Sequence, residues 1–364
     1  MDRKLNVAVL MGGRTAEHEV SLATGQMVVR TLDRSKYNIK PIIITKEGRW
    51  LLTGGYLRQL DSPEAEWTVE EQFYGRALVS LSAGYALDKA VEEKVDVVFI
   101  AMHGPFGEDG TVQGLLEMLD IPYTGSNVLA SSLAMNKVKS REIFMNYELL
   151  GPAYLALDLW QWRRAQEEIV SRIARDLGFP CVLKPAELGS SVGVRIAKSG
   201  EELVSCVESA LEYGPEILAE EYLEGDEITC AVLGAPPGEE PIALAPTQII
   251  PKMDAFFDYH AKYTPDATEE ITPAQIGDRL IARAQEIAVI AHKALGCGGL
   301  SRTDMIVRDG EIYVLELNTI PGMTEMSLYP QAAKAVGLPF SKVLDRIIEL
   351  ALVYHKTKQP RTGL

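Results

Sequence analysis

The sequence predicts a protein of mixed class, with an α/β unit at the N-terminus and α+β units after it. Largely apolar runs at residues 6–11 and 95–101 are typical of buried strands, and each is followed by a glycine-rich turn and a helical segment. Strands that alternate with helices indicate a parallel sheet. The later strands follow one another more closely, which favours α+β packing.

The predicted elements divide the chain into units at 1–125, 126–221 and 222–364. Helices are expected at 16–32, from about 112, and at 137–149, 163–177, 201–213, 276–295 and 340–355. Strands are expected at 6–11, 37–45, 95–101, 153–157, 181–185, 192–197, 217–222, 228–233 and 242–249. Residues 251–273 are expected to form a long loop, and loops of that length in compact domains often act as lids.

Composition limits the class of protein. The chain has 364 residues, of which 47% are hydrophobic, enough for two or three domains with cores of their own. A formal net charge of -15 argues against nucleic-acid binding through the overall field. The four cysteines form no Cys-x-x-Cys pair, and no apolar run reaches membrane-spanning length. We therefore expect a reduced cytoplasmic protein with no membrane partner.

Two apolar strands near the C-terminus, 305–307 and 312–315, are joined by a turn at Asp309-Gly310 and end in polar residues. Those residues are Arg302, Asp304, Glu316 and Asn318. Glu316 and Asn318 share a face because side chains alternate along a strand. A loop of odd length would place Asp304 on that face, and a two-residue turn would place it on the other. The first geometry gives oxygen ligands suited to Mg²⁺, and the alternative is a hairpin with charged ends.

A lysine precedes a loop of small residues in the middle of the chain. Lys184-Pro185 is followed by the run 189–194, and such loops let backbone N–H groups approach phosphate oxygens. The run also matches Gly-x-Ser-x-Gly, which raises a hydrolase hypothesis with Ser191 as the nucleophile. That motif requires a helix after the serine, and the residues at 194–197 are expected to be extended.

Several single residues are weaker signals. Lys137 begins a predicted helix, where a lysine is usually just solvated. The segment around Glu220, Glu221, Leu223 and Glu227 could offer backbone groups to an adenine and a carboxylate to a ribose, but it also fits a charged sheet edge. Glu17 lies in a first helical turn, where capping is the ordinary role of an acid. His103 follows a strand beside glycines, where functional loops concentrate.

Together, these motifs resemble the D-alanine–D-alanine ligase family of the ATP-grasp superfamily over nearly the whole chain. The matching segments, in order, are 12–21, 103–114, 121–126, 184–185, 189–193, 261–263, 302–304, 315–319 and 321–324. Arg14-Thr15 and Asn136 depart mildly from the pattern of that family. The resemblance implies an ATP-grasp fold with a Rossmann-like N-terminal domain, and a nucleotide held between the central and C-terminal domains.

The resemblance also implies roles for individual residues. Lys137 and Lys184 would contact the phosphates, Glu220, Glu221 and Leu223 the adenine, and Glu227 the ribose. Asp304, Glu316 and Asn318 would hold two Mg²⁺ ions, or Mn²⁺ in their place. Glu17, with Ser190 and Tyr263, would bind the ammonium group of the first D-alanine, near His103. Arg302 and the Gly322 N–H would form an oxyanion site, Ser327 and Leu328 would position the second D-alanine, and Lys262 would move with the lid.

The implied reaction is ATP-dependent joining of two D-alanine molecules, through an acyl phosphate, for peptidoglycan synthesis. A carboxylate is a poor acyl donor, so its oxygen first attacks the γ-phosphate of ATP, with metals and lysines balancing the charge. The resemblance also implies a homodimer. The alternatives are a ligase that forms D-alanyl-D-lactate, against which Tyr263 argues, and a nucleotide-binding module without catalysis.

Overall fold

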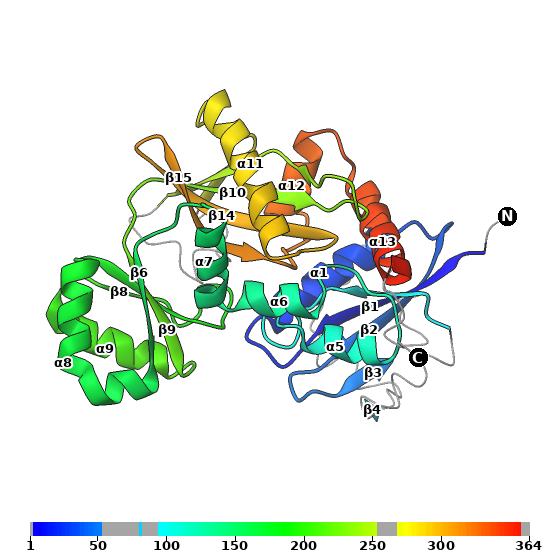
Figure 1. The fold of residues 1–364 in the computed structure, drawn as a ribbon. Coiled ribbons are helices and arrows are strands. Elements are labelled where there is room, and N and C mark those ends of the chain that lie inside the picture. The colour runs from blue at the N-terminus through cyan, green and yellow to red at the C-terminus, as the bar shows by residue number, and fades with distance from the viewer. Residues whose placement is uncertain (1–2, 53–79, 82–93, 253–267, 358–364) are drawn as a thin grey trace.

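Three β-sheets organise the part of the chain that the computed structural model describes, namely residues 3–52, 80–81, 94–252 and 268–357 (Figure 1). The sheets follow one another in sequence, and each packs against its own helices. None of the helices in these ranges combines the length and the apolar character that a membrane crossing requires.

The first sheet has the strand order β4-β3-β2-β1-β5. β1 (Leu5–Gly12) pairs in parallel with β2 (Tyr37–Ile44) and β5 (Val97–Ile100), as the alternating pattern predicts. β3 (Trp50–Leu52) and β4 (Ser80–Leu81) extend the sheet in the antiparallel sense, so it is mixed rather than purely parallel. The edge formed by β3 and β4 is therefore an antiparallel addition, which the alternation of strands and helices does not predict.

Helices cover both faces of this sheet. Val7, Val9 and Met11 of β1 share a core with α1 (His18–Thr31) and the C-terminal helix α13 (Phe340–Thr357). The intervening Ala8 and Leu10 pack on the side of α5 (Thr111–Met118). Burial on both faces explains why β1 is a continuous apolar run rather than an alternating one.

The second sheet is antiparallel, with the order β6-β9-β7-β8. Its strands are β6 (Tyr154–Asp158), β7 (Cys181–Pro185), β8 (Arg195–Ala197) and β9 (Glu216–Glu221). α8 (Leu159–Asp176) and α9 (Gly200–Leu211) share its core. α8 begins four residues before the expected position at 163, because Asp158 and Gln161 form a capping box. α6 (Val128–Met135) and α7 (Lys137–Asn146) lie between this lobe and the rest (Figure 1).

The third sheet has the order β13-β12-β10-β14-β15, with β11 paired to β10. Its strands are β10 (Asp226–Leu233), β11 (Ile242–Ala243), β12 (Thr247–Pro251), β13 (Thr268–Ile271), β14 (Leu300–Arg308) and β15 (Glu311–Asn318). The strand expected at 242–249 is split in two, because Pro246 has no N–H to donate to a ladder. The prediction of a loop over 251–273 is wrong for its last residues, because Thr268–Ile271 forms an edge strand that pairs with β12.

The two faces of the third sheet have different characters. One face supplies Ile228, Cys230 and Met305 to a core that it shares with α11 (Asp278–Ala294). The strand registers put Glu227, Thr229 and the polar end of β14 on the opposite face. A sheet that is apolar on one side and polar on the other leaves its polar side available for a binding site.

Candidate functional site

A β-bulge sets the arrangement of the polar hairpin ends. Arg308 pairs with Glu311, so the turn consists of Asp309 and Gly310 alone, both with positive φ (53° and 80°). Of the two turn lengths considered, the structure has the two-residue turn. Between Asp304–Glu316 and Met305–Val314 the register shifts by one residue, which leaves Leu315 as an extra residue in β15. The bulge reverses the parity of the short turn, so Asp304 still faces the same way as Glu316.

The carboxylate of Asp304 is held from three sides. Arg302 donates to it through Nε at 2.8 Å and Nη2 at 2.7 Å. Asn318 Nδ2 donates to Oδ2 at 3.2 Å, and Thr229 Oγ1 donates to Oδ1 at 2.6 Å. Thr229 was not predicted, because only the pairing of β10 with β14 brings it opposite Asp304. These contacts fix the direction of the carboxylate before any ligand binds.

The hairpin face has a donor set that fits Mg²⁺. Asp304 and Glu316 provide carboxylates, and Asn318 provides an amide, on the same face. Within the described ranges, no three His, Cys, Asp or Glu side chains gather as a metal-binding cluster. Mg²⁺ commonly takes only one or two protein carboxylates and completes its shell with water and substrate phosphates. Two carboxylates beside an amide therefore suit this ion.

Lys137 approaches the hairpin from the first turn of α7. Its Nζ lies 3.2 Å from Glu316 Oε2 and donates to the Leu188 carbonyl at 2.5 Å. Asn136 caps the helix by accepting from Lys139 N at 2.9 Å. The amide of Asn136 also donates to Glu187 Oε1 at 3.0 Å, which an aspartate could not do. The predicted phosphate lysine and a predicted metal ligand thus meet across two lobes.

Lys184, the second predicted phosphate lysine, is paired with a buried acid. Its Nζ lies 2.5 Å from Glu220 Oε2, and Arg141 Nη2 lies 2.6 Å from Glu220 Oε1. Burial alone would raise the pKa of Glu220, but the charges of Lys184 and Arg141 outweigh it, so the pKa lies below its usual value. Glu220 is therefore an ionised carboxylate between two cations.

The side chains of Glu220 and Glu221 already have partners within the protein. The carboxylate of Glu220 is only 1% exposed, and Glu221 Oε1 accepts from Ala153 N at 2.8 Å. A contact of this segment with adenine would therefore come from main-chain groups, such as those near the buried Leu223, rather than from these side chains. Glu227 follows in β10 on the same sheet face as Thr229, two residues away, which suits a ribose contact at the edge of the hairpin site.

Glu17 lies where the N-terminal sheet meets the small-residue loop. Ser190 Oγ donates to Glu17 Oε1, and Glu17 is buried before α1. A Cβ at Gly104 would overlap Glu17 Oε2, and one at Gly189 would come within 3.2 Å of it. Ser190 and Ser191 both have positive φ (50° and 57°), which few L residues adopt. The predicted pairing of Glu17 with Ser190 is present, and glycine is needed beside it.

His103 is a buried neutral group at this junction. Its Nε2 lies 2.8 Å from Thr24 Oγ1 of α1. Burial lowers the pKa of His103 to about 4, and the positive charge of Arg302 acts in the same direction. His103 is thus an imidazole at neutral pH, able to hydrogen-bond to an anion but not to neutralise one.

Glu108 is a further acid at this junction, and the sequence did not indicate that its pKa is raised. Its Oε2 accepts from Gly104 N at 2.8 Å, and its Oε1 accepts from Ile320 N at 3.1 Å. Burial, together with the charge of Glu17, raises the pKa of Glu108 to about 8. Glu108 therefore ties the glycine loop to the end of the hairpin mostly as a neutral acid.

The raised pKa of Glu108 predicts a pH-dependent stability. Between about pH 4.5 and pH 8 the unfolded chain ionises at this position while the folded chain keeps the proton, so stability falls as pH rises. We expect Glu108→Gln to flatten the decline of Tm over this range, measured by thermal unfolding. Glu142→Gln, at an exposed acid, is the control and should keep the wild-type slope. Parallel Tm profiles for Glu108→Gln and wild type would contradict the prediction.

The remaining predicted residues are partly placed. Ser327 precedes α12 (Leu328–Ala335), and its Oγ accepts from Thr324 N at 3.0 Å. A Cβ at Gly322 would lie 3.0 Å from that same oxygen, so Gly322 and Ser327 are neighbours. Leu328 is the first residue of α12. Lys262 and Tyr263 lie outside the described residues.

Glu270 of β13 is a second acid that the sequence did not single out. It accepts from Gln331 Nε2 of α12 at 2.7 Å. Burial raises the pKa of Glu270, while the bond from Gln331 and the charge of Arg302 oppose the shift. Glu270 of β13 therefore lies close enough to the site for the charge of Arg302 to act on it.

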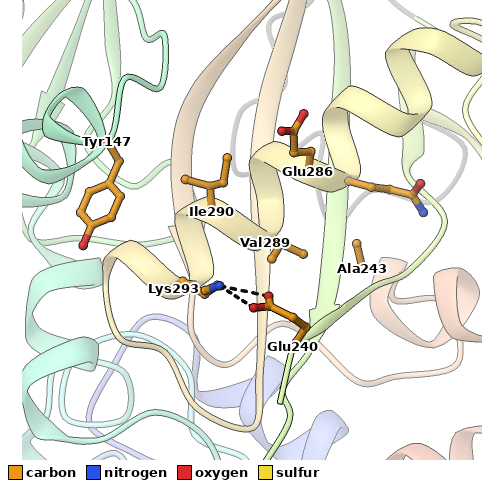
Figure 2. Close-up of a pocket in the computed structure, with 8 residues that line it drawn as sticks. Tyr147, Glu240, Ala243, Glu286, Val289, Ile290 and Lys293 are labelled. Atoms are coloured by element: carbon orange, nitrogen blue, oxygen red, sulfur yellow. Dashed lines mark hydrogen bonds and ion pairs between the residues drawn. The ribbon is translucent and has the colours of Figure 1, made fainter. Parts of the chain in front are cut away.

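A hollow of about 620 Å³ on the outer side of α11 lies elsewhere (Figure 2). Tyr147, Val289 and Ile290 line it, and Lys293 pairs with Glu240 across it at 2.9 Å. None of the predicted site residues contributes to its wall. It is therefore no candidate for the reaction.

Comparisons with known proteins identify the family. The family model described as D-ala D-ala ligase N-terminus matches residues 6–126, and that described as D-ala D-ala ligase C-terminus matches residues 143–349. A D-alanine--D-alanine ligase from Geobacillus thermodenitrificans is 39% identical, with 98% of each chain covered. One from Syntrophobacter fumaroxidans is 43% identical, over 96% of this chain and 98% of the relative.

Solved structures give the same result. The D-alanine--D-alanine ligase from Bacillus anthracis complexed with ATP has a TM-score of 0.75 and 34% identity, with 98% of this chain and 100% of that chain covered. The VanG D-Ala:D-Ser ligase from Enterococcus faecalis has a TM-score of 0.82 and 33% identity, with 96% and 100% covered. The chain therefore belongs to the D-alanine–D-alanine ligase family.

Proposed function

We propose that the protein joins two D-alanine molecules into D-alanyl-D-alanine, with cleavage of ATP to ADP and phosphate. The observation that carries this proposal is the meeting of Lys137 with Glu316 beside Asp304. A lysine from one lobe and two carboxylates from another form a site that can hold a metal-bound polyphosphate. Family membership supports the same reaction.

In the proposed site, Lys137 and Lys184 contact the phosphates, and main-chain groups near Leu223 contact the adenine. Glu227 binds the ribose. Two Mg²⁺ ions held by Asp304, Glu316 and Asn318 would offset the negative charge of the phosphates during transfer, a role that Mn²⁺ could also fill. The two lysines and these acids lie on lobes that correspond to proposed domains at 126–221 and 222–364, beside an N-terminal domain at 1–125.

The substrates would bind where the three sheets converge. Glu17, oriented by Ser190, binds the ammonium group of the first D-alanine, in a network that we propose also includes Tyr263 and His103. The carboxylate of that D-alanine attacks the γ-phosphate, the bond to the bridging oxygen breaks, ADP leaves, and an acyl phosphate is formed. Lys262 would help to exclude water, which would otherwise hydrolyse this intermediate.

The second half of the reaction forms the peptide bond. The amine of the second D-alanine, positioned by Ser327 and Leu328, attacks the acyl carbon in its neutral form. Negative charge then develops on the acyl oxygen, and fixed donors stabilise such charge efficiently. Arg302 and the Gly322 N–H are the proposed donors, and phosphate leaves as the peptide bond forms.

The hydrolase hypothesis fails on local structure. The residues after Ser191 form a turn and then β8, rather than the helix that a nucleophile elbow requires. We expect Ser191→Ala to lower kcat less than Glu316→Ala does, measured as ADP release under saturating substrates. Complete loss in Ser191→Ala, with Glu316→Ala still active, would restore the hydrolase hypothesis.

The proposed reaction can be tested on the purified protein. ADP release should depend on D-alanine in the presence of Mg²⁺ and ATP, with D-alanyl-D-alanine as the product. D-Lactate and D-serine, each supplied with D-alanine, test the two related specificities, and L-alanine is the stereochemical control. Unchanged ATP with every D-configured substrate would refute the proposal. We further propose a homodimer, which light scattering during size exclusion would test.

A further inference from the structure

We infer that Arg141 is a positioning residue that couples the bulge of the β14–β15 hairpin to the phosphate lysine Lys184. The inference rests on the proposed function, because it assigns a task to Arg141 within the nucleotide site. Arg141 lies inside α7 and touches neither reacting group. Its effect would pass through Glu220 on one side and the main chain of β15 on the other.

The guanidinium of Arg141 connects two lobes of the protein. Nη2 donates to Glu220 Oε1 in the second sheet at 2.6 Å and to the Leu315 carbonyl at 3.2 Å. Nη1 donates to the Val314 carbonyl. The side chain is 2% exposed, which is rare for an arginine and requires such partners. A guanidinium offers its donors in one plane, so it can hold a carboxylate and two carbonyls at once.

Glu220 divides its charge between Arg141 and Lys184. Its two oxygens face the two cations separately, Oε1 toward Arg141 and Oε2 toward Lys184. Without Arg141, the full negative charge of a buried carboxylate would act on Lys184 alone. The ammonium would then be held more tightly within the protein and be less free to contact a phosphate.

The guanidinium of Arg141 also donates hydrogen bonds to the main chain at the bulge. Leu315 is the extra residue that brings Glu316 opposite Asp304. Val314 precedes it and pairs with Met305 on the other side of the register shift. Val314 N also donates to the Leu150 carbonyl at 2.8 Å, so α7 and the segment after it bind both backbone groups of Val314. Contacts at the bulge would therefore stabilise the register in which Glu316 reaches the site.

α7 places Lys137 and Arg141 on the same edge. Lys137 and Arg141 are four residues apart, which puts them on one face of a helix. Lys137 contacts Glu316, and Arg141 contacts the residues just before it. A displacement of Arg141 would thus disturb Lys184 and the Glu316 site together, while leaving the Ser327 side of the site untouched.

Binding of a nonhydrolysable ATP analogue with Mg²⁺, in the absence of D-alanine, tests this inference by calorimetry. In Arg141→Gln we expect the dissociation constant to rise roughly 10–100-fold, the range typical of lost outer-shell contacts. The Mg²⁺ concentration for half-saturation should rise with it. The KM for ATP should rise while the KM for the second D-alanine stays near the wild-type value. Arg141→Lys, which keeps the charge but not the planar donors, should lie in between.

The control is Lys139→Gln. Lys139 is an exposed lysine of the same helix and pairs with Glu142, so this variant should bind the nucleotide as the wild type does. Gly151→Ala is an independent probe, because its methyl group would overlap Arg141 Nη1 and push the guanidinium without removing its charge. We expect weaker nucleotide binding there too. If Arg141→Gln folds and binds the nucleotide and Mg²⁺ as the wild type does, the inference is wrong. If Arg141→Gln, Arg141→Lys and Gly151→Ala all unfold, Arg141 has a purely structural role and the inference is also wrong.

The two proposals fail differently. If wild-type protein releases no ADP with any D-configured substrate, the proposed reaction is wrong. If wild-type protein is active and the Arg141 variants bind nucleotide as it does, only the positioning role is wrong.

Discussion

Glu316→Ala is expected to lower D-alanine-dependent ADP release by at least about 100-fold, because metal-supported charge stabilisation contributes several kcal/mol to phosphoryl transfer. Glu316 is the carboxylate that Lys137 meets from the other lobe, and the bulge aligns it with Asp304. The loss should appear in kcat and in the Mg²⁺ requirement together. Steady-state ADP release over a range of Mg²⁺ concentrations measures both.

The control for this experiment is on the same strand. Glu311→Ala removes an exposed acid at the other end of β15 and should leave kcat unchanged. Glu316 is itself partly exposed, so its replacement should cost little stability, and thermal unfolding checks that both variants fold. A folded Glu316→Ala protein with wild-type kcat would remove Glu316 from the proposed metal set.

Arg302→Met is expected to lower kcat by roughly 10²–10³-fold, the usual cost of losing one oxyanion donor. Arg302 is also bidentate to Asp304, so its removal leaves that carboxylate with Asn318 and Thr229 alone. The two roles separate in the kinetics. Loss of an oxyanion donor lowers kcat at constant KM for ATP, whereas release of Asp304 raises that KM.

Arg302→Lys is the informative companion. A lysine keeps the positive charge but cannot make the two parallel bonds to Asp304. If charge at the acyl oxygen is what matters, Arg302→Lys should recover part of the kcat lost in Arg302→Met. A kcat within about threefold of wild type in Arg302→Met would contradict the oxyanion role, on the scale of such losses.

The hairpin illustrates how far local sequence rules reach. Alternation placed Glu316 and Asn318 on one face, and the structure agrees. The sequence did not decide the turn length, and the structure has the two-residue turn Asp309-Gly310. The bulge at Leu315 that restores the alignment has no local signature, since contacts with Arg141 and Leu150, which are distant in sequence, accompany it.

Burial and pairing across domains explain the other differences. The pairing of the Glu220 carboxylate with Arg141 and Lys184 could not be read from the sequence, because the fold brings the three residues together. Glu108 lay within a recognised motif, yet its raised pKa depends on burial in the folded protein and on the charge of Glu17, more than 90 positions away in the chain. Strong periodic elements such as α13 were predictable, whereas the short edge strand β13 was not, because a strand of four residues has little pattern.

The contacts at Val314 also affect solubility. β15 ends its sheet, and open strand edges invite pairing with strands from other molecules. Here the Leu150 carbonyl takes the N–H of Val314, and Arg141 takes its C=O, near the middle of that edge. The segment from Arg141 to Leu150, rather than a proline or a lysine within the strand, thus covers this edge against pairing with other molecules.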